Sequence, residues 1–222
     1  MGNSIAIDGP AGAGKSTIAK LLSKEMGYIY VDTGAMYRAI AVYFAQNNIN
    51  PDDEDEINSA VENVDITIRY EDGVQQVILN GVNVTGLLRT EQIGNMASKT
   101  SKYGAVRSKL VDLQRKIAEN ADVVMDGRDI GTTVLPNATV KIYLTASCDA
   151  RAGRRFDELV AKGEQCDLEA IKKDIEARDY QDMHRSISPL KQADDAVLVD
   201  TSEMSIEQVI VRLKEIINEK AG

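Results

Sequence analysis

Short runs of apolar residues alternate with longer amphipathic segments along this chain. Such an alternation is typical of βαβ units built on a parallel sheet. The short runs are almost continuously apolar, as strands covered by helices on both faces must be. The pattern predicts an α/β fold of the phosphate-loop (P-loop) NTPase type, with a five-stranded parallel sheet flanked by helices. We expect its strands at residues 4–8, 28–32, 122–126, 140–145 and 196–200.

The segment between the second and third expected strands has a different pattern. Over residues 65–85, apolar and polar positions alternate with a period of two, which indicates half-exposed strands. Asp72-Gly73 and Asn80-Gly81 interrupt this alternation, and such dipeptides favour tight hairpin turns because they accept positive φ. We therefore expect a small three-stranded antiparallel insert. The acidic residues 51–56 before it are interpreted as a solvated loop that opens a helix.

The last helix has a readable start and one apolar face. Ser205 and Gln208 are spaced as a capping box, in which each side chain bonds to the backbone N–H of the other residue. Apolar residues then recur at helical spacing from Ile206 to Ile217. This helix is predicted to serve packing only.

The first expected strand leads directly into a candidate phosphate-binding loop. Glycines let a backbone wrap closely around a polyphosphate, and the following helix N-terminus completes the anion site. In this motif Lys15 reaches the β- and γ-phosphates, and Ser16 places its hydroxyl group on Mg²⁺. The pattern G-x-x-x-x-G-K-[ST] is matched by Gly9, Pro10, Ala11, Gly12, Ala13, Gly14, Lys15 and Ser16, with Thr17 following.

Composition narrows the choice of partners. The 222 residues include 26 Lys and Arg against 35 Asp and Glu, a net charge of −9, which disfavours binding of polymeric nucleic acid through a broad basic face. Cys148 and Cys166 are too few for a disulfide framework, and His184 is the only histidine, which excludes multi-histidine metal sites. No signal peptide is recognised, and no apolar run approaches the roughly 18 residues of a membrane span. We expect a cytoplasmic protein without a membrane partner.

Two function classes use a phosphate loop in a chain of this size: small-acceptor kinases and nucleotide-controlled switches. GTPase switches carry Asp-x-x-Gly and Asn-Lys-x-Asp elements, and neither string occurs here. The kinase is favoured because polar motifs follow the other strands. Residues 32–38 read Asp-Thr-Gly-Ala-Met-Tyr-Arg, and residues 126–132 read Asp-Gly-Arg-Asp-Ile-Gly-Thr.

With these motifs the chain resembles the bacterial cytidylate kinases, within the nucleoside monophosphate (NMP) kinases. The ordered set also includes the β-rich insert, an arginine-rich lid and R-D-x-x-D-x-x-R-x-x-x-P-L at residues 178–190, and it runs from Ile5 to about Leu213. The resemblance implies Mg²⁺-dependent transfer of the γ-phosphoryl group of ATP to CMP or dCMP. A uridylate or adenylate kinase is the nearest alternative, and a switch is the alternative of another class.

The resemblance also implies a division of the chain. One monomeric kinase domain would comprise a core (residues 1–32, 104–148 and 190–222), an NMP-binding region with the insert (33–103), and a lid with the helix after it (149–189). Arg151, Arg154 and Arg155 share one face of a helix in this lid, and we expect them to close over the donor phosphates. An anion between them would relieve their mutual repulsion.

The acceptor residues are carried over by the same resemblance. Arg38, Arg128 and Arg185 would hold the acceptor phosphate, whereas Ser98, Arg107 and Asp129 would read the cytosine. Arg178 and Asp182 would bind the pentose, with Tyr37 near the sugar, and Thr33 is also expected to bind the acceptor. Without the family, an Arg-Asp pair such as Arg128 and Asp129 is more often a structural ion pair. Arg178, Asp182 and Arg185 share one face of a predicted helix, which alternatively is an exposed, salt-bridged face.

No general base is required, because the acceptor is a phosphate oxygen that is already ionised. Asp126 either holds Mg²⁺ through water or orients the phosphate loop. Arg69, Arg115 and Arg212 are expected to be solvated surface charges. The residues expected to act in catalysis are Lys15, Arg128, Arg151, Arg154, Arg155 and Arg185.

Overall fold

Five parallel strands form the central sheet of the computed structural model, which describes residues 2–221. Neighbouring strands follow the order β2-β6-β1-β7-β8. All five expected strands are confirmed within one residue of their expected ends. They are β1 (Ser4–Asp8), β2 (Ile29–Asp32), β6 (Val123–Gly127), β7 (Val140–Thr145) and β8 (Val197–Asp200).

The register of the sheet brings the polar strand ends together. Asp8 pairs with Gly127, and Asp32 pairs with Asp126. Because the strands are parallel, their carboxyl ends lie at one edge, where open α/β sheets bind ligands. Three aspartates from β1, β2 and β6 therefore lie side by side under the first loop.

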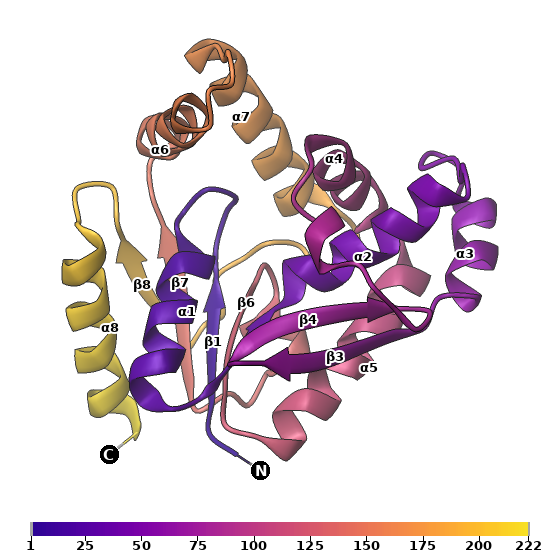
Figure 1. The fold of residues 1–222 in the computed structure, drawn as a ribbon. Coiled ribbons are helices and arrows are strands. Elements are labelled where there is room, and N and C mark those ends of the chain that lie inside the picture. The colour runs from indigo at the N-terminus through magenta and orange to yellow at the C-terminus, as the bar shows by residue number, and fades with distance from the viewer. Residues whose placement is uncertain (1, 222) are drawn as a thin grey trace.

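Helices cover both faces of the sheet, as the apolar strands require (Figure 1). Ile5 and Ile7 pack in one core with α1 and α8, whereas Ala6 packs in the other with α2 and α5. The predicted capping box opens α8: Ser205 N donates to Gln208 Oε1 (2.8 Å), and Gln208 N donates to Ser205 Oγ (3.3 Å). The four helices are α1 (Lys15–Met26), α2 (Thr33–Gln46), α5 (Gly104–Asn120) and α8 (Ile206–Ala221).

The predicted insert is an antiparallel sheet in the order β3-β4-β5. Positive φ angles at Asp72, Gly73, Asn80 and Gly81 form the two expected turns. Its strands are β3 (Ile66–Glu71), β4 (Val74–Leu79) and β5 (Val82–Asn83). The acidic loop before it opens a helix, α3 (Glu54–Glu62), as predicted, with Asp53 as the N-cap. A short turn, η1 (Thr85–Leu87), and α4 (Glu91–Thr100) return the chain to α5.

Two helices, α6 (Cys148–Ala161) and α7 (Leu168–His184), stand above the carboxyl ends of the strands (Figure 1). The sequence places Arg185 on the same helix as Arg178 and Asp182, but α7 ends at His184 and Arg185 has extended backbone angles. Beyond this end Ser188 is left-handed (φ 48°), and the N–H of Leu190 donates to the carbonyl oxygen of Asp182 (2.8 Å), so the chain turns back onto the last turn of α7. Within the described residues, no helix has the length and apolarity of a membrane span.

Candidate active site

A cleft of about 1020 Å³ lies between the strand ends and the helices above them. The phosphate loop and the start of α1 form one wall, and α6 and α7 form another. Residues from α2, α4 and α5 complete it on the side of the insert. The lining of the cleft therefore includes residues of the phosphate loop and of the motifs at 32–38, 126–132 and 178–190.

The phosphate loop has glycine at positions where most other residues would be strained or would clash. Gly12 and Gly14 have φ angles of 76° and 85°, in the left-handed region. A Cβ atom on Gly9 would lie 1.9 Å from the carbonyl oxygen of Leu144. Gly14 caps α1 without a side chain, so the first N–H groups of this helix face the cleft without a side-chain partner.

Ser16 binds Asp126 at the base of the loop, and the charge of Lys15 lies close to it. Ser16 Oγ donates to Asp126 Oδ2 (2.8 Å), and Tyr30 OH donates to Asp126 Oδ1 (2.9 Å). Lys15 Nζ donates to the carbonyl oxygen of Pro10 (2.6 Å). In this arrangement Asp126 orients the phosphate loop, which is one of the two roles left open by the sequence.

Burial perturbs both charged groups at this point. Desolvation, reinforced by the nearby Arg128, lowers the pKa of Lys15 from 10.5 to about 7. Desolvation and the neighbouring Asp32 raise the pKa of Asp126 from 3.8 to about 6. An anion in the loop would favour the protonated ammonium, because an opposite charge within a few ångströms favours the charged form.

The oxygen atoms of Ser16 and Asp126 suit a magnesium ion. Mg²⁺ prefers oxygen ligands and is usually bound by one or two protein groups together with water and substrate phosphates. The part of the chain that the structure describes contains no group of three or more His, Cys, Asp or Glu residues able to hold a metal. Beside Ser16 and Asp126, the other ligands of Mg²⁺ would be water and substrate phosphates.

Asp8 is an organising residue that sequence reasoning missed. It is buried at the end of β1, and its two carboxylate oxygens accept from the backbone N–H groups of Ile130 and Gly131, each at 2.7 Å. Burial raises its pKa to about 6. These bonds tie the loop that carries Arg128 and Asp129 to the strand before the phosphate loop. The only available signal was an acidic residue at a strand end.

Asp32 is a second organising residue, and it reveals a missed arginine. Its side chain caps α2 by accepting from Ala35 N (2.8 Å). It also pairs with Arg38 (3.2 Å) and with Arg89 (2.9 Å), and both arginines line the cleft. Arg89 lies between η1 and α4, outside every recognised motif.

Ion pairs link several of the other acceptor-site residues in a chain that is buried at Arg107 and Asp129 and partly exposed at Arg128. Asp129 pairs with Arg107 and with Arg185, the latter at 3.4 Å. Arg128 Nε instead binds Asp182 (2.8 Å), which Arg185 also approaches (3.6 Å). The reading of Arg128-Asp129 as a pair is therefore wrong: neighbouring residues on this extended turn point to different partners.

Two more of the expected acceptor residues lie beside this chain of ion pairs. Tyr37 lies under the guanidinium of Arg107, which is 5.6 Å from its ring centre. Thr33 donates through its hydroxyl group to the carbonyl oxygen of Asp126 (2.7 Å). Both line the cleft, on the first turns of α2.

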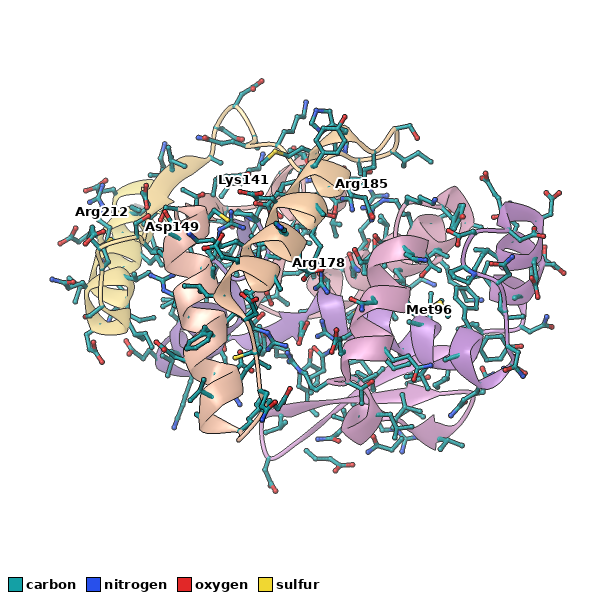
Figure 2. The ribbon with its side chains drawn as sticks, turned by 90° about the horizontal axis from the view of Figure 1, so that it is seen from above. Met96, Lys141, Asp149, Arg178, Arg185 and Arg212 are labelled. Carbon is teal, nitrogen blue, oxygen red and sulfur yellow. The ribbon has the colours of Figure 1, made fainter. Side chains whose placement is uncertain are left out.

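Across the cleft, α7 contacts α4. Arg178 donates to Asn95 Oδ1 (2.6 Å), and Gln181 donates to the carbonyl oxygen of Ser98 (2.6 Å). The view from above shows Arg178 between these two helices (Figure 2). Arg178 also pairs with Asp174 (3.0 Å), so the exposed part of α7 is salt-bridged as well as facing the cleft.

The three arginines of α6 all line the cleft but differ in their surroundings. Arg151 is buried, and it binds Asp179 (2.6 Å) and the carbonyl oxygen of Ala11 in the phosphate loop (2.9 Å). Arg154 binds the carbonyl oxygen of Thr201 (2.5 Å), and Arg155 pairs with Glu158 (3.2 Å). Protein oxygens therefore offset part of the repulsion between these three guanidinium groups.

Comparison with known proteins identifies the family. The cytidylate kinase family model matches residues 5–219. The cytidylate kinase of Leuconostoc mesenteroides is 53% identical over 96% of this chain and 95% of its own length. That of Carboxydothermus hydrogenoformans is 50% identical over 97% of both chains. A solved shikimate kinase from Bacteroides thetaiotaomicron covers 97% of this chain and 98% of its own with a TM-score of 0.52, and at 13% identity it supports the fold alone.

These matches confirm the resemblance seen in the motifs, and they favour neither a uridylate kinase, an adenylate kinase nor a nucleotide switch. The chain belongs to the cytidylate kinase family.

Proposed function

We infer that this protein transfers the γ-phosphoryl group of ATP to CMP or dCMP, giving CDP or dCDP. One observation carries the inference beyond family membership. A single cleft holds the phosphate loop at one end and, at the other, Asp129 between two arginines, Arg107 and Arg185. A donor nucleotide and a cytosine nucleotide can therefore meet in it with their phosphates together.

At the donor end, the backbone N–H groups of the loop and Lys15 would bind the β- and γ-phosphates. The charge of the phosphates favours the protonated form of Lys15, whose pKa burial has lowered to about 7. Ser16 and Asp126 would hold Mg²⁺, which neutralises charge on the phosphate oxygens when it is bound. Arg151, Arg154 and Arg155 lie on the opposite wall and would add positive charge around the transferring group.

At the acceptor end, the guanidinium groups of Arg38, Arg128 and Arg185 would bind the phosphate of CMP. Each forms paired N–H bonds to oxygens and stays charged at any working pH. Their aspartate partners hold them in place before the substrate arrives, so less ordering is needed on binding.

Asp129 would accept a hydrogen bond from the exocyclic amine of cytosine, with Arg107 and Ser98 at the same edge. A carboxylate oxygen can accept a further bond while it pairs with arginine. Uracil presents an oxygen at that position, so two acceptors would face each other with no hydrogen between them, and the buried uracil oxygen would lose its hydrogen bond at a cost of about 1–3 kcal/mol. This difference would select cytosine. Arg178 and Asp182 would contact the pentose.

A cytoplasmic, monomeric enzyme fits this proposal. Cys148 and Cys166 are free thiols rather than a disulfide, as in a reducing compartment. The segments 33–103 and 149–189 would close on the core and exclude water during transfer.

A coupled assay of ADP release tests the proposal. Purified protein with ATP and Mg²⁺ is given CMP, dCMP, UMP or AMP as the acceptor. We expect turnover with CMP and dCMP at rates far above those with UMP and AMP. The absence of CMP turnover would overturn the proposed function, and equal turnover of UMP would overturn the role of Asp129 alone.

A further inference from the structure

The antiparallel insert is tied to the edge of the central sheet by side chains. β2 is an edge strand, so its outer backbone groups are not paired within the sheet. Tyr70 of β3 donates to the carbonyl oxygen of Tyr30 (3.1 Å). Gln75 of β4 binds Asp32 twice: Asp32 N donates to Gln75 Oε1 (2.9 Å), and Gln75 Nε2 donates to the carbonyl oxygen of Asp32 (3.1 Å).

At Asp32, the side-chain amide of Gln75 therefore forms the two backbone hydrogen bonds that a neighbouring strand would otherwise form. Its side chain is buried, and it satisfies both backbone groups of Asp32 at once. A primary amide offers a donor and an acceptor on one rigid plane, which matches the N–H and C=O of one residue. This pair of bonds fixes the position of Asp32 at the end of β2.

The carboxylate of Asp32 in turn orients two arginines of the cleft. Within residues 2–221, the guanidinium of Arg38 binds no other protein group, and its buried Nε has no partner. The side chain of Arg89 is 70% exposed and is held by Asp32 alone among the described residues. A displacement of Asp32 would therefore move both guanidinium groups.

We propose that Gln75 is a positioning residue for the acceptor phosphate: it fixes the main chain of Asp32 and, through the Asp32 carboxylate, the guanidinium groups of Arg38 and Arg89. The proposal rests on the proposed function, because it assigns these two arginines to the phosphate of the acceptor nucleotide. It also gives the insert a role in the site, since β4 supplies the residue that holds the end of β2.

The neighbouring glutamine provides a matched control. Gln76 has the same side chain on the same strand but points to the other face, where its oxygen accepts from Asn83 (3.1 Å). Replacing Gln76 removes a hydrogen bond within the insert without touching Asp32. A loss caused by weakening the insert in general would therefore follow from Gln76→Ala as well as from Gln75→Ala.

The test compares CMP with cytidine, which has the base and the sugar but no phosphate. Affinities of the wild type, Gln75→Ala, Gln75→Asn and Gln76→Ala are measured by titration calorimetry, with cytidine measured by displacement of CMP. We expect Gln75→Ala to weaken CMP binding about tenfold, the equivalent of one hydrogen bond to a charged group. Cytidine and ATP binding should change less than about twofold, and Gln76→Ala should match the wild type.

Equal loss of CMP and cytidine affinity would overturn the proposal, because Gln75 would then act on the whole acceptor region. Unchanged CMP affinity would overturn it as well. Gln75→Asn, whose shorter amide can keep only one of the two bonds, takes the place of Gln75→Ala if the latter does not fold. Binding is read without turnover, so a failure of the proposed function appears separately, as wild-type protein that does not phosphorylate CMP.

Discussion

Replacing Lys15 by methionine should abolish phosphoryl transfer and at the same time stabilise the nucleotide-free protein. Lys15 is only 5% exposed, and its ammonium group donates to Pro10 at 2.6 Å. Burial and the positive charge of Arg128 lower its pKa from 10.5 to about 7. The charged ammonium is therefore unfavourable in the folded state. Methionine keeps the unbranched side chain and removes the charge.

The sign and size of the effect follow from proton linkage. The folded pKa of Lys15 lies below the unfolded one, so the unfolded chain binds more protons between about pH 7 and pH 10.5. The free energy of unfolding of the wild type should consequently rise with pH across this window. Lowering the pKa of Lys15 from 10.5 to about 7 corresponds to a destabilisation of the folded state by about 4–5 kcal/mol, because a pKa difference of one is worth about 1.4 kcal/mol. Lys15→Met also loses the hydrogen bond to Pro10, which lowers the stabilisation by about 1 kcal/mol or more. We therefore expect the free energy of unfolding of the variant to exceed that of the wild type by about 1–3 kcal/mol at pH 7.

Urea unfolding of both proteins from pH 7 to pH 9.5 measures the effect, with Lys20→Met as the control for an exposed lysine on the same helix. The advantage of Lys15→Met should shrink as the pH rises, because the wild type loses its penalty. ADP release by Lys15→Met should fall by at least about a thousandfold. A variant less stable than the wild type at pH 7, or a difference independent of pH, would refute the argument that burial of this ammonium group opposes folding.

Three further substitutions test other parts of the site. Asp129→Asn keeps the shape of the side chain but replaces one carboxylate oxygen with an N–H donor. The ratio of kcat/KM for CMP to kcat/KM for UMP should therefore fall about 10–100-fold. An unchanged ratio would contradict the assignment of Asp129 to the cytosine amine. Arg89→Ala should raise the KM for CMP about tenfold, whereas Arg69→Ala, on the exposed face of the insert, should not, and equal effects would remove Arg89 from the acceptor site. Gly9→Ala places a Cβ atom 1.9 Å from the oxygen of Leu144, so urea unfolding should show a loss of about 3–5 kcal/mol, and a loss below about 1 kcal/mol would show that the loop relaxes.

The sheet and the insert were predictable because their signals are local. An apolar run bounded by polar residues, or an Asn-Gly dipeptide between alternating segments, fixes a strand or a turn without reference to the rest of the chain. The phosphate loop was predictable for the same reason, since its glycines are required by the backbone angles of the loop itself. The predicted capping box at Ser205 was confirmed for this reason as well.

The partners of the charged residues were not predictable because they come from distant segments. Asp32 and Arg89 are 57 residues apart, and Asp8 lies 122 residues from Ile130. Nothing in the neighbourhood of Arg89 distinguishes it from Arg69, and only the fold brings it to Asp32. Arg115 is exposed, as expected of a solvated surface charge, but its guanidinium also binds the backbone carbonyl oxygens of Thr133 and Val134, which the sequence did not indicate.

The ion pairs also explain part of the excess of Asp and Glu over Lys and Arg in this chain. Arg38, Arg128 and Arg151 are each bound to an aspartate of the protein itself. A buried guanidinium without such a partner would be costly, so these aspartates allow the cleft to keep its arginines desolvated and aligned. The incoming phosphates then bind to guanidinium groups that are already in place. Because these side chains become ordered when the protein folds, nucleotide binding carries a smaller loss of conformational entropy. Part of the excess of acidic residues therefore belongs to the site: removing an aspartate here should weaken the binding of an anion, although the net charge would become more positive.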